Sequence, residues 1–304
     1  MTRRESLKNF LGIAALSGLS FNGMSRLWAA IRTRKIPSSG ESLPVVGVGT
    51  WQTFDVGTSD EERAPLREVL NELLEYGGSV IDSSPMYGRS EKVVGDLATA
   101  MEGTDKLFMA TKVWTNGRQA GIDQMQRSMD RMQKRPIDLM QIHNLVDWKT
   151  HIKTLQGWKE SGRIRYMGIT HYIESAYDEM MHIMTNYPLD FIQLNYSVES
   201  RTAENRILPL ARDRGIAVII NRPYEGGSLF RKVKGRKLPD WAAEFDCNSW
   251  GQFFLKYILS HDAVTCVIPG TSKPHHMVDN LGAGLGRLPD TGQRAKITNF
   301  LKNL

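Results

Sequence analysis

Strand and helix signals alternate eight times along this chain of 304 residues, and no other feature restricts its fold as strongly. The clearest helical periodicity covers 61–76 and 123–134, between short apolar stretches typical of buried strands. No Pro/Gly-rich linker, low-complexity tract or repeat divides the sequence. Since α/β barrels commonly reach this length as one domain, we predict a (β/α)8 TIM barrel over 33–304. Its strands are expected near 45–49, 79–82, 107–111, 137–142, 164–169, 190–194, 216–221 and 264–267.

Four polar side chains stand at or just beyond the ends of three of these strands. Asp82 and Tyr87 follow the second strand, Lys112 follows the third and His143 follows the fourth. In an α/β barrel the C-terminal ends of the parallel strands converge on one face. These four side chains can therefore meet, although they are far apart in the sequence.

The chemistry available to this set is proton delivery to a carbonyl oxygen. The phenol of Tyr87 is a poor acid near neutral pH, but a nearby ammonium favours the phenolate and lowers the pKa. Lys112 is the obvious ammonium, and Asp82 can hold it charged and aimed. His143 can donate a hydrogen bond to a substrate oxygen and orient it. The sequence suggests no nucleophile, metal cluster or phosphate cradle beside them.

Each of these residues has a structural alternative when it is considered alone. A histidine at a strand end is commonly a satisfied structural residue, an aspartate beyond a strand is commonly a helix cap, and a lysine is commonly a solvated charge. Four such residues in one order along the strands favour the catalytic interpretation.

The segment 81–97, with Lys112 and His143 at their strand ends, resembles the aldo-keto reductase family. The resemblance extends over about 36–280, and it implies an NAD(P)(H)-dependent oxidoreductase that interconverts aldehydes or ketones and alcohols by hydride transfer. It implies that Tyr87 is the general acid, that Lys112 and Asp82 tune it, and that His143 positions the carbonyl. The resemblance leaves open a second possibility, a dinucleotide-binding redox sensor or accessory subunit with little turnover.

The resemblance also implies a coenzyme site, in which this chain departs from the common family pattern. Gly270 and His276 stand where many members have the Lys and Arg that bind the 2'-phosphate of NADPH, although Lys273 can still supply a cation. NADP(H) is expected ahead of NAD(H), with the preference weakened by these changes. Asn221 stands where an aromatic residue usually stacks beneath the nicotinamide ring. The other implied coenzyme contacts are His171, Gln193, Arg222, Pro223, Thr271, Ser272 and Asn280.

Three aromatic residues follow strands on the predicted active face. Trp51, Trp114 and Tyr172 can form an aromatic wall for a small-molecule substrate, and Asn144 offers a polar contact. Such walls favour flat or apolar carbonyl compounds, although sugars also stack on tryptophan. Each aromatic could instead plug the end of the barrel.

Two segments outside the barrel strands complete the prediction of the fold. A short β-hairpin is expected over 34–44, with its turn at 38–41, and it would close the bottom of the barrel. The longest irregular stretch, 224–248, leaves the seventh strand on the active face. We interpret it as a loop that covers the cofactor or shapes the pocket.

The net charge of +6 is concentrated at the N-terminus. Residues 1–35 contain seven Lys or Arg and one acidic residue, which leaves 32 basic and 32 acidic residues in the remainder. A neutral barrel gives no electrostatic basis for binding nucleic acid. Cys247 and Cys266 fit neither a zinc site nor a disulfide framework. We expect a monomer.

Residues 1–32 resemble a twin-arginine export signal. Arg3 and Arg4 precede a mildly apolar stretch, 10–21, that is too short and too weakly apolar to predict a membrane span. Ser6 departs from the aromatic residue favoured there, and no clean cleavage site is evident. We expect a periplasmic protein that meets the membrane only during export, or through an uncleaved signal. A cytoplasmic enzyme is the alternative.

Overall fold

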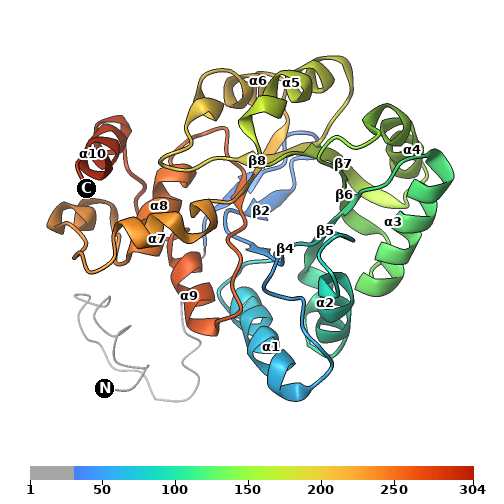
Figure 1. Cartoon of the computed structure of the whole chain (residues 1–304), viewed down its shortest axis with the longest axis horizontal. Helices are drawn as coiled ribbons and strands as arrows, with labels where there is room; N and C mark the ends of the chain where they lie inside the picture. The colour runs from blue at the N-terminus through green and yellow to red at the C-terminus, as the bar shows by residue number, and fades with distance from the viewer. Residues whose placement is uncertain (1–30) are drawn as a thin grey trace, which may run out of the picture.

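Eight parallel strands form the centre of the computed structural model, which describes residues 31–304 (Figure 1). Each strand pairs with the next one along the chain, and the bridges Val46–Val267 and Gly49–Gly270 bring the last strand back to the first. The predicted (β/α)8 barrel is therefore confirmed. Its strands are β3 (Val48–Gly49), β4 (Val80–Asp82), β5 (Phe108–Val113), β6 (Ile137–His143), β7 (Ile164–Thr170), β8 (Phe191–Asn195), β9 (Ala217–Asn221) and β10 (Cys266–Val267).

Helices surround this barrel (Figure 1). The helix α1 (Asp60–Glu75) shows why they form: Ser59 caps its first turn, and Leu66, Val69, Leu70 and Leu73 form one buried stripe at helical spacing. The helix expected over 123–134 instead begins at Arg118 and ends at Met132. The sequence placed its start too late because the first turn of the helix has no apolar pattern. The helices that follow the barrel strands are α1 (Asp60–Glu75), α2 (Ser90–Thr99), α3 (Arg118–Met132), α4 (Trp148–Glu160), α5 (Tyr177–Asn186), α6 (Ile207–Asp213), α8 (Trp250–Leu259) and α9 (Pro274–Gly282).

The predicted N-terminal hairpin lies at the N-terminal ends of the barrel strands. Its strands β1 (Thr33–Lys35) and β2 (Ser42–Pro44) pair antiparallel. Ile36 and Leu43 from the hairpin are buried in one cluster with Phe108, Tyr166 and Phe191 inside the barrel. These side chains fill the lower barrel, so it is a packed core and not a pore.

The stretch 224–248 is more ordered than the sequence indicated. It contains the short helix α7 (Ser228–Lys232) and two 3-10 helices, Glu225–Gly227 and Asp240–Phe245. Leu229 and Phe245 are fully buried and anchor the stretch to the barrel. A helix of five residues between glycines gives no periodic signal, which is why the sequence indicated only a loop.

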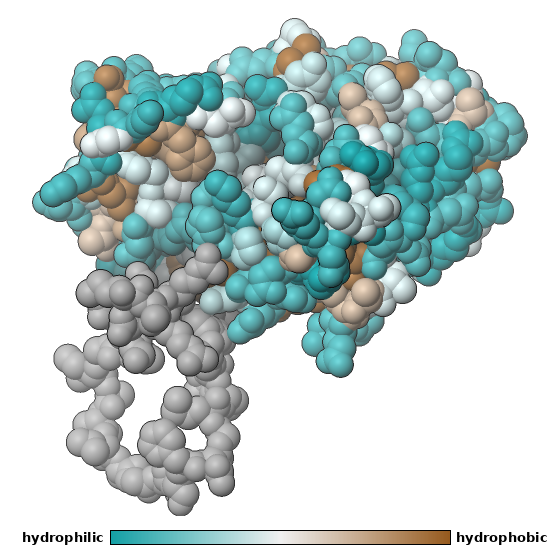
Figure 2. All heavy atoms as spheres, turned by 60° about the horizontal axis from the view of Figure 1, so that its bottom comes forward, coloured by the Kyte–Doolittle hydropathy of each residue, from teal (hydrophilic) through white to brown (hydrophobic). Residues whose placement is uncertain are grey.

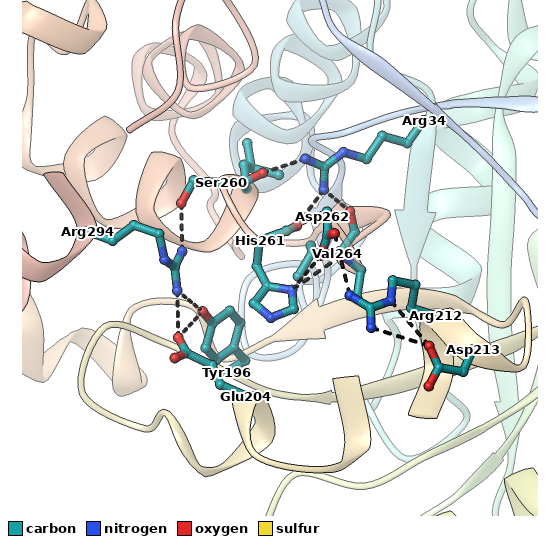
Figure 3. A network of polar contacts seen from close by, with 12 residues as sticks. Arg34, Tyr196, Glu204, Arg212, Asp213, Ser260, His261, Asp262, Val264 and Arg294 are labelled. Carbon is teal, nitrogen blue, oxygen red and sulfur yellow. Dashed lines mark hydrogen bonds and ion pairs between the residues drawn. The ribbon is translucent and has the colours of Figure 1, made fainter. Parts of the chain in front are cut away.

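Two arginines connect the first strand of the hairpin and the helix α10 (Thr291–Lys302) to the region around the end of α8 (Figure 3). Arg34 of the hairpin donates to the carbonyl oxygens of Leu259 (2.6 Å) and His261 (2.9 Å). Arg294, on the C-terminal helix α10, donates to Glu204 Oε1 (2.6 Å) and to Ser260 Oγ (2.6 Å). The termini of the barrel domain are thus fixed by charged hydrogen bonds to one region.

Replacement of Arg294 is expected to destabilise the fold. Arg294→Ala should lower the free energy of unfolding by about 2–3 kcal/mol, because charge-assisted bonds to half-buried partners are lost. Denaturant titration of the native protein, of Arg294→Ala and of a control variant measures the free energy of unfolding of each. The control is Arg206→Ala, which breaks the exposed pair with Asp178 and should cost less than about 0.5 kcal/mol. Equal costs would contradict the assigned role of Arg294.

The predicted signal segment, 1–32, lies outside the described residues except for its last two. Ile31 is buried in the core, and Arg32 N donates to the carbonyl oxygen of Gly284 (3.0 Å). Within 31–304, no helix has the length and apolar character to cross a membrane. Hydrophilic side chains cover most of the face in Figure 2, and hydrophobic ones form small, separate patches.

Candidate active site

The C-terminal ends of β4 and β5 place a buried ion pair at the mouth of the barrel. Lys112 Nζ lies 2.6 Å from Asp82 Oδ2 and donates a second hydrogen bond to the carbonyl oxygen of Ser83, also at 2.6 Å. Lys112 is fully buried and Asp82 is 2% exposed. Burial alone would lower the pKa of Lys112, but the neighbouring charge of Asp82 raises it above its usual 10.5. The lysine therefore stays an ammonium.

Two amides fix the other oxygen of the Asp82 carboxylate. Gln193 Nε2 donates to Asp82 Oδ1 at 2.8 Å, and Gln141 Nε2 donates to it at 3.1 Å. Thr170 Oγ1 in turn donates to Gln193 Oε1 at 3.0 Å. Strands β6, β7 and β8 thus hold the aspartate in one orientation, and the aspartate aims the ammonium.

Tyr87 lies directly over this pair. Lys112 Nζ is 5.1 Å from the centre of the phenol ring, and the His143 ring meets it edge to face at 5.8 Å. Burial raises the pKa of Tyr87 above 10, although the charge of Lys112 acts to lower it. The expectation of a lowered pKa is therefore wrong for this structure, because burial outweighs the ammonium. Tyr87 remains protonated near neutral pH, which is the form that a proton donor needs.

His143 is held neutral beside the tyrosine. Burial and the charge of Lys112 lower the pKa of His143 to about 2. Its Nδ1 lies 2.9 Å from Ser84 Oγ. A neutral imidazole carries one N–H, so His143 can donate one hydrogen bond to a ligand oxygen only if that proton is on the nitrogen that faces the ligand.

A cavity of about 610 Å³ opens above these residues. Asp82, Tyr87 and His143 line it together with three of the four predicted substrate residues, Trp51, Asn144 and Tyr172. The fourth, Trp114, is not among the lining residues, although its ring lies 6.5 Å from that of His143. Sequence reasoning missed Met86 and Phe230 in this wall.

Five of the predicted coenzyme residues line the same cavity: Gln193, Asn221, Arg222, Pro223 and Gly270. Arg222 has a left-handed backbone (φ 49°), and its guanidinium lies 5.8 Å from the centre of the Tyr172 ring. A non-glycine residue in this conformation is uncommon and frequently accompanies a functional site. The amide oxygens of Asn144 and Asn221 are buried without a partner among the described residues.

The remaining coenzyme residues lie outside the lining. Ser272, Lys273 and His276 are exposed where β10 leads into α9. Asn280 Oδ1 accepts a hydrogen bond from the Tyr224 hydroxyl (2.6 Å), and Thr271 Oγ1 accepts one from Lys273 N (3.0 Å). The structure does not bring His171 into the cavity.

His171 is engaged by its own loop. Its Nδ1 accepts hydrogen bonds from the backbone N–H groups of Tyr172 (3.0 Å) and Ile173 (3.3 Å). This local turn was not evident from the sequence. Of these two expected coenzyme contacts, Gln193 lines the cavity and His171 does not.

The Aldo/keto reductase family model matches residues 45–295. The chain belongs to the aldo/keto reductase family. It is 26% identical over 258 residues to the methylglyoxal reductase YeaE of Escherichia coli, and this match covers 82% of this chain and 89% of that protein. It is also 26% identical over 309 residues to an NADH-specific methylglyoxal reductase of the same organism, with coverages of 82% and 93%.

Solved structures share the fold of this reductase. An aldo-keto reductase from Klebsiella pneumoniae in complex with NADPH matches with a TM-score of 0.74 and 20% identity, over 90% of this chain and 95% of that one. The holo form of an aldo-keto reductase from Bacillus halodurans matches with a TM-score of 0.73 and 22% identity, over 89% and 96%. As predicted, this chain is an oxidoreductase that interconverts carbonyl compounds and alcohols with a nicotinamide coenzyme.

Proposed function

We propose that this enzyme reduces aldehydes or ketones with NADPH in preference to NADH, and that Tyr87 is the general acid. The observation that carries the proposal is the buried pair of Lys112 and Asp82, 2.6 Å apart and directly below the phenol. When bound, the coenzyme supplies the hydride. As the carbonyl oxygen gains negative charge, Tyr87 transfers its hydroxyl proton to that oxygen, and Lys112 stabilises the phenolate that remains. His143 donates a hydrogen bond to the same oxygen.

A steady-state assay tests this proposal. Purified protein, NADPH and an aldehyde should show saturable, aldehyde-dependent loss of the reduced coenzyme's absorbance. Tight binding of NADPH without turnover of any aldehyde or ketone would favour a dinucleotide sensor instead.

The residues around the cavity suit a dinucleotide. The unpartnered amide oxygens of Asn144 and Asn221 can each accept a hydrogen bond from a bound group. Gly270 leaves room where an added Cβ would lie 3.2 Å from Gly49 O. Arg222 and Lys273 are cations that can contact the phosphates of the dinucleotide. Burial, together with neighbouring His275 and Lys273, lowers the pKa of His276, so that residue is neutral at pH 7.

Lys273 is therefore expected to carry the selection of NADPH. Lys273→Ala should raise the Kd for NADPH roughly fivefold and leave the Kd for NADH unchanged, because only NADPH carries the 2'-phosphate. Fluorescence titration with each coenzyme measures both constants. Lys302→Ala, at the exposed end of α10, controls for the loss of a surface charge. A parallel change in both constants would contradict the assignment.

The apolar rim favours a flat or apolar carbonyl substrate. Trp51, Tyr172 and Phe230 line the cavity and are 49%, 43% and 40% exposed. Exposed rings at a cavity mouth are available to stack on a ligand. We therefore propose an aromatic or otherwise bulky aldehyde as the preferred class, beyond the methylglyoxal named for two relatives.

Trp51→Ala tests this substrate class. The variant should lower kcat/KM for an aromatic aldehyde about tenfold, as expected for the loss of one ring contact. Methylglyoxal is the internal control, because it is too small to span the rim, and its kcat/KM should change less than about twofold. Equal losses for both aldehydes would mean that Trp51 supports the fold of the site and does not select the substrate.

We also propose export to the periplasm by the twin-arginine pathway, with the coenzyme already bound. The motif that supports this lies in residues 1–30, outside the described part of the chain. Free nicotinamide coenzyme is scarce outside the cytoplasm, so an exported reductase needs a tightly held dinucleotide that a second substrate recycles in place. Mass spectrometry of the small molecule released from protein purified from the periplasm tests this. Near-equal amounts of dinucleotide and protein are expected, and an empty site would contradict tight retention.

A further inference from the structure

We propose that Ser84 is a positioning residue that holds His143 in the Nε2–H tautomer. Ser84 is fully buried, and its hydroxyl oxygen lies 2.9 Å from His143 Nδ1. The functional meaning of this contact rests on the proposed role of His143 as a donor to the substrate carbonyl. The assignment of the tautomer itself rests only on the hydrogen-bond geometry.

The direction of the hydrogen bond follows from the number of protons available. A serine hydroxyl has one proton to donate and two lone pairs that accept. The backbone N–H of Met86 donates to Ser84 Oγ at 3.3 Å. Within 31–304, the only acceptor in hydrogen-bond contact with the Ser84 hydroxyl is His143 Nδ1.

The two tautomers therefore leave different groups unsatisfied. With the proton on Nδ1, His143 would donate to Ser84, and the buried hydroxyl proton would have no acceptor, which is unfavourable for a buried polar group. With Nδ1 unprotonated, Ser84 donates to it and both groups are satisfied. The single ring proton then lies on Nε2.

This tautomer is the one that the proposed reaction requires. Nδ1 is directed to Ser84, and Nε2 makes no hydrogen bond to the described part of the chain, while His143 lines the cavity. Nε2 is therefore the nitrogen open to a ligand. The rings of His143 and Tyr87 pack edge to face, with their centres 5.8 Å apart. A carbonyl oxygen beside Tyr87 thus meets an N–H donor, where the other tautomer would present a repelling lone pair.

The neighbouring serine has a different partner, so the role belongs to one hydroxyl. Ser83 Oγ accepts a hydrogen bond from Thr50 Oγ1 at 2.9 Å. The end of β4 and the residues after it thus support two functional side chains separately: Asp82, the last residue of β4, contacts Lys112, and Ser84 contacts His143.

The tautomer can be read directly by NMR on the full protein without substrate. In protein labelled with ¹⁵N-histidine, two-bond ¹H–¹⁵N spectra should show His143 with an unprotonated Nδ1 that accepts a hydrogen bond and a protonated Nε2. The chain has seven histidines, so loss of one pattern in His143→Asn assigns the signals. A protonated Nδ1 in the native protein would overturn the proposal.

Two serine variants then test the cause. Ser84→Ala should shift the Nδ1 resonance of His143 and lower kcat/KM for an aldehyde roughly tenfold, with the Kd for NADPH unchanged. The matched control is Ser90→Ala, because Ser90 is equally buried but donates to Thr50 O and does not contact His143. An Nδ1 resonance that is unchanged in Ser84→Ala, or shifted equally in both variants, would overturn the proposal. If the protein reduces no carbonyl, the proposed function fails while the native tautomer assignment stands.

Discussion

Tyr87→Phe is expected to lower kcat for carbonyl reduction by about three orders of magnitude, while NADPH still binds. The phenylalanine ring keeps the packing against His143 but removes the only hydroxyl that lies over Lys112 within the described part of the chain. General acid catalysis contributes about 10²–10⁴ in rate, so its loss should dominate the kinetics. Aldehyde-dependent oxidation of NADPH gives kcat, and fluorescence titration gives the coenzyme Kd.

A second tyrosine variant separates this effect from a general loss of hydroxyl groups. Tyr187 packs edge to face on Trp148, away from the cavity, so Tyr187→Phe should leave kcat within about twofold. If Tyr87→Phe keeps most of the native rate, another group delivers the proton and the assignment of the acid is wrong.

Lys112→Met is expected to damage both activity and stability. Without the ammonium, no charge stabilises the phenolate that Tyr87 becomes, and kcat should fall by about three orders of magnitude. Asp82 would also be left as a buried carboxylate without its cation, which should cost about 3–5 kcal/mol in the free energy of unfolding. Denaturant titration and turnover measurements on the same preparation give both quantities.

The double variant Lys112→Met/Asp82→Asn distinguishes the two effects. Asparagine removes the unpaired charge, so stability should recover substantially while activity stays low. Recovery of activity together with stability would show that Lys112 acts only by supporting the fold.

The barrel and its four central residues could be predicted because both depend on local patterns. Short apolar stretches that alternate with helical patterns identify the strands. The C-terminal ends of parallel strands lie on one face of the barrel, so residues such as Asp82 and His143 meet there although many residues separate them in the sequence. The observed ion pair of Lys112 with Asp82 follows directly from that arrangement. Patterns within short stretches of the sequence were sufficient for these predictions.

Other features depend on tertiary packing and could not be predicted. The pKa of Tyr87 is raised because burial of its hydroxyl outweighs the nearby ammonium, and sequence reasoning could weigh only the ammonium. His171 turns into its own loop through backbone hydrogen bonds, and Phe230 reaches the cavity from a helix too short to give a periodic pattern. Met86 adjoins Tyr87 in the sequence, and only the fold of the turn shows that it faces the cavity.

Transfer of deuterium is the measurement that tests the central claim most directly. The enzyme would be incubated with an aromatic aldehyde and NADPH that carries deuterium at both hydrogen positions of nicotinamide C4, and the alcohol would be analysed by mass spectrometry. We expect one deuterium on the carbinol carbon, an ordinary proton on its oxygen, and almost no product from Tyr87→Phe. Bound NADPH that transfers no deuterium to any aldehyde, or equal product from Tyr87→Phe, would contradict a reductase in which Tyr87 supplies the proton.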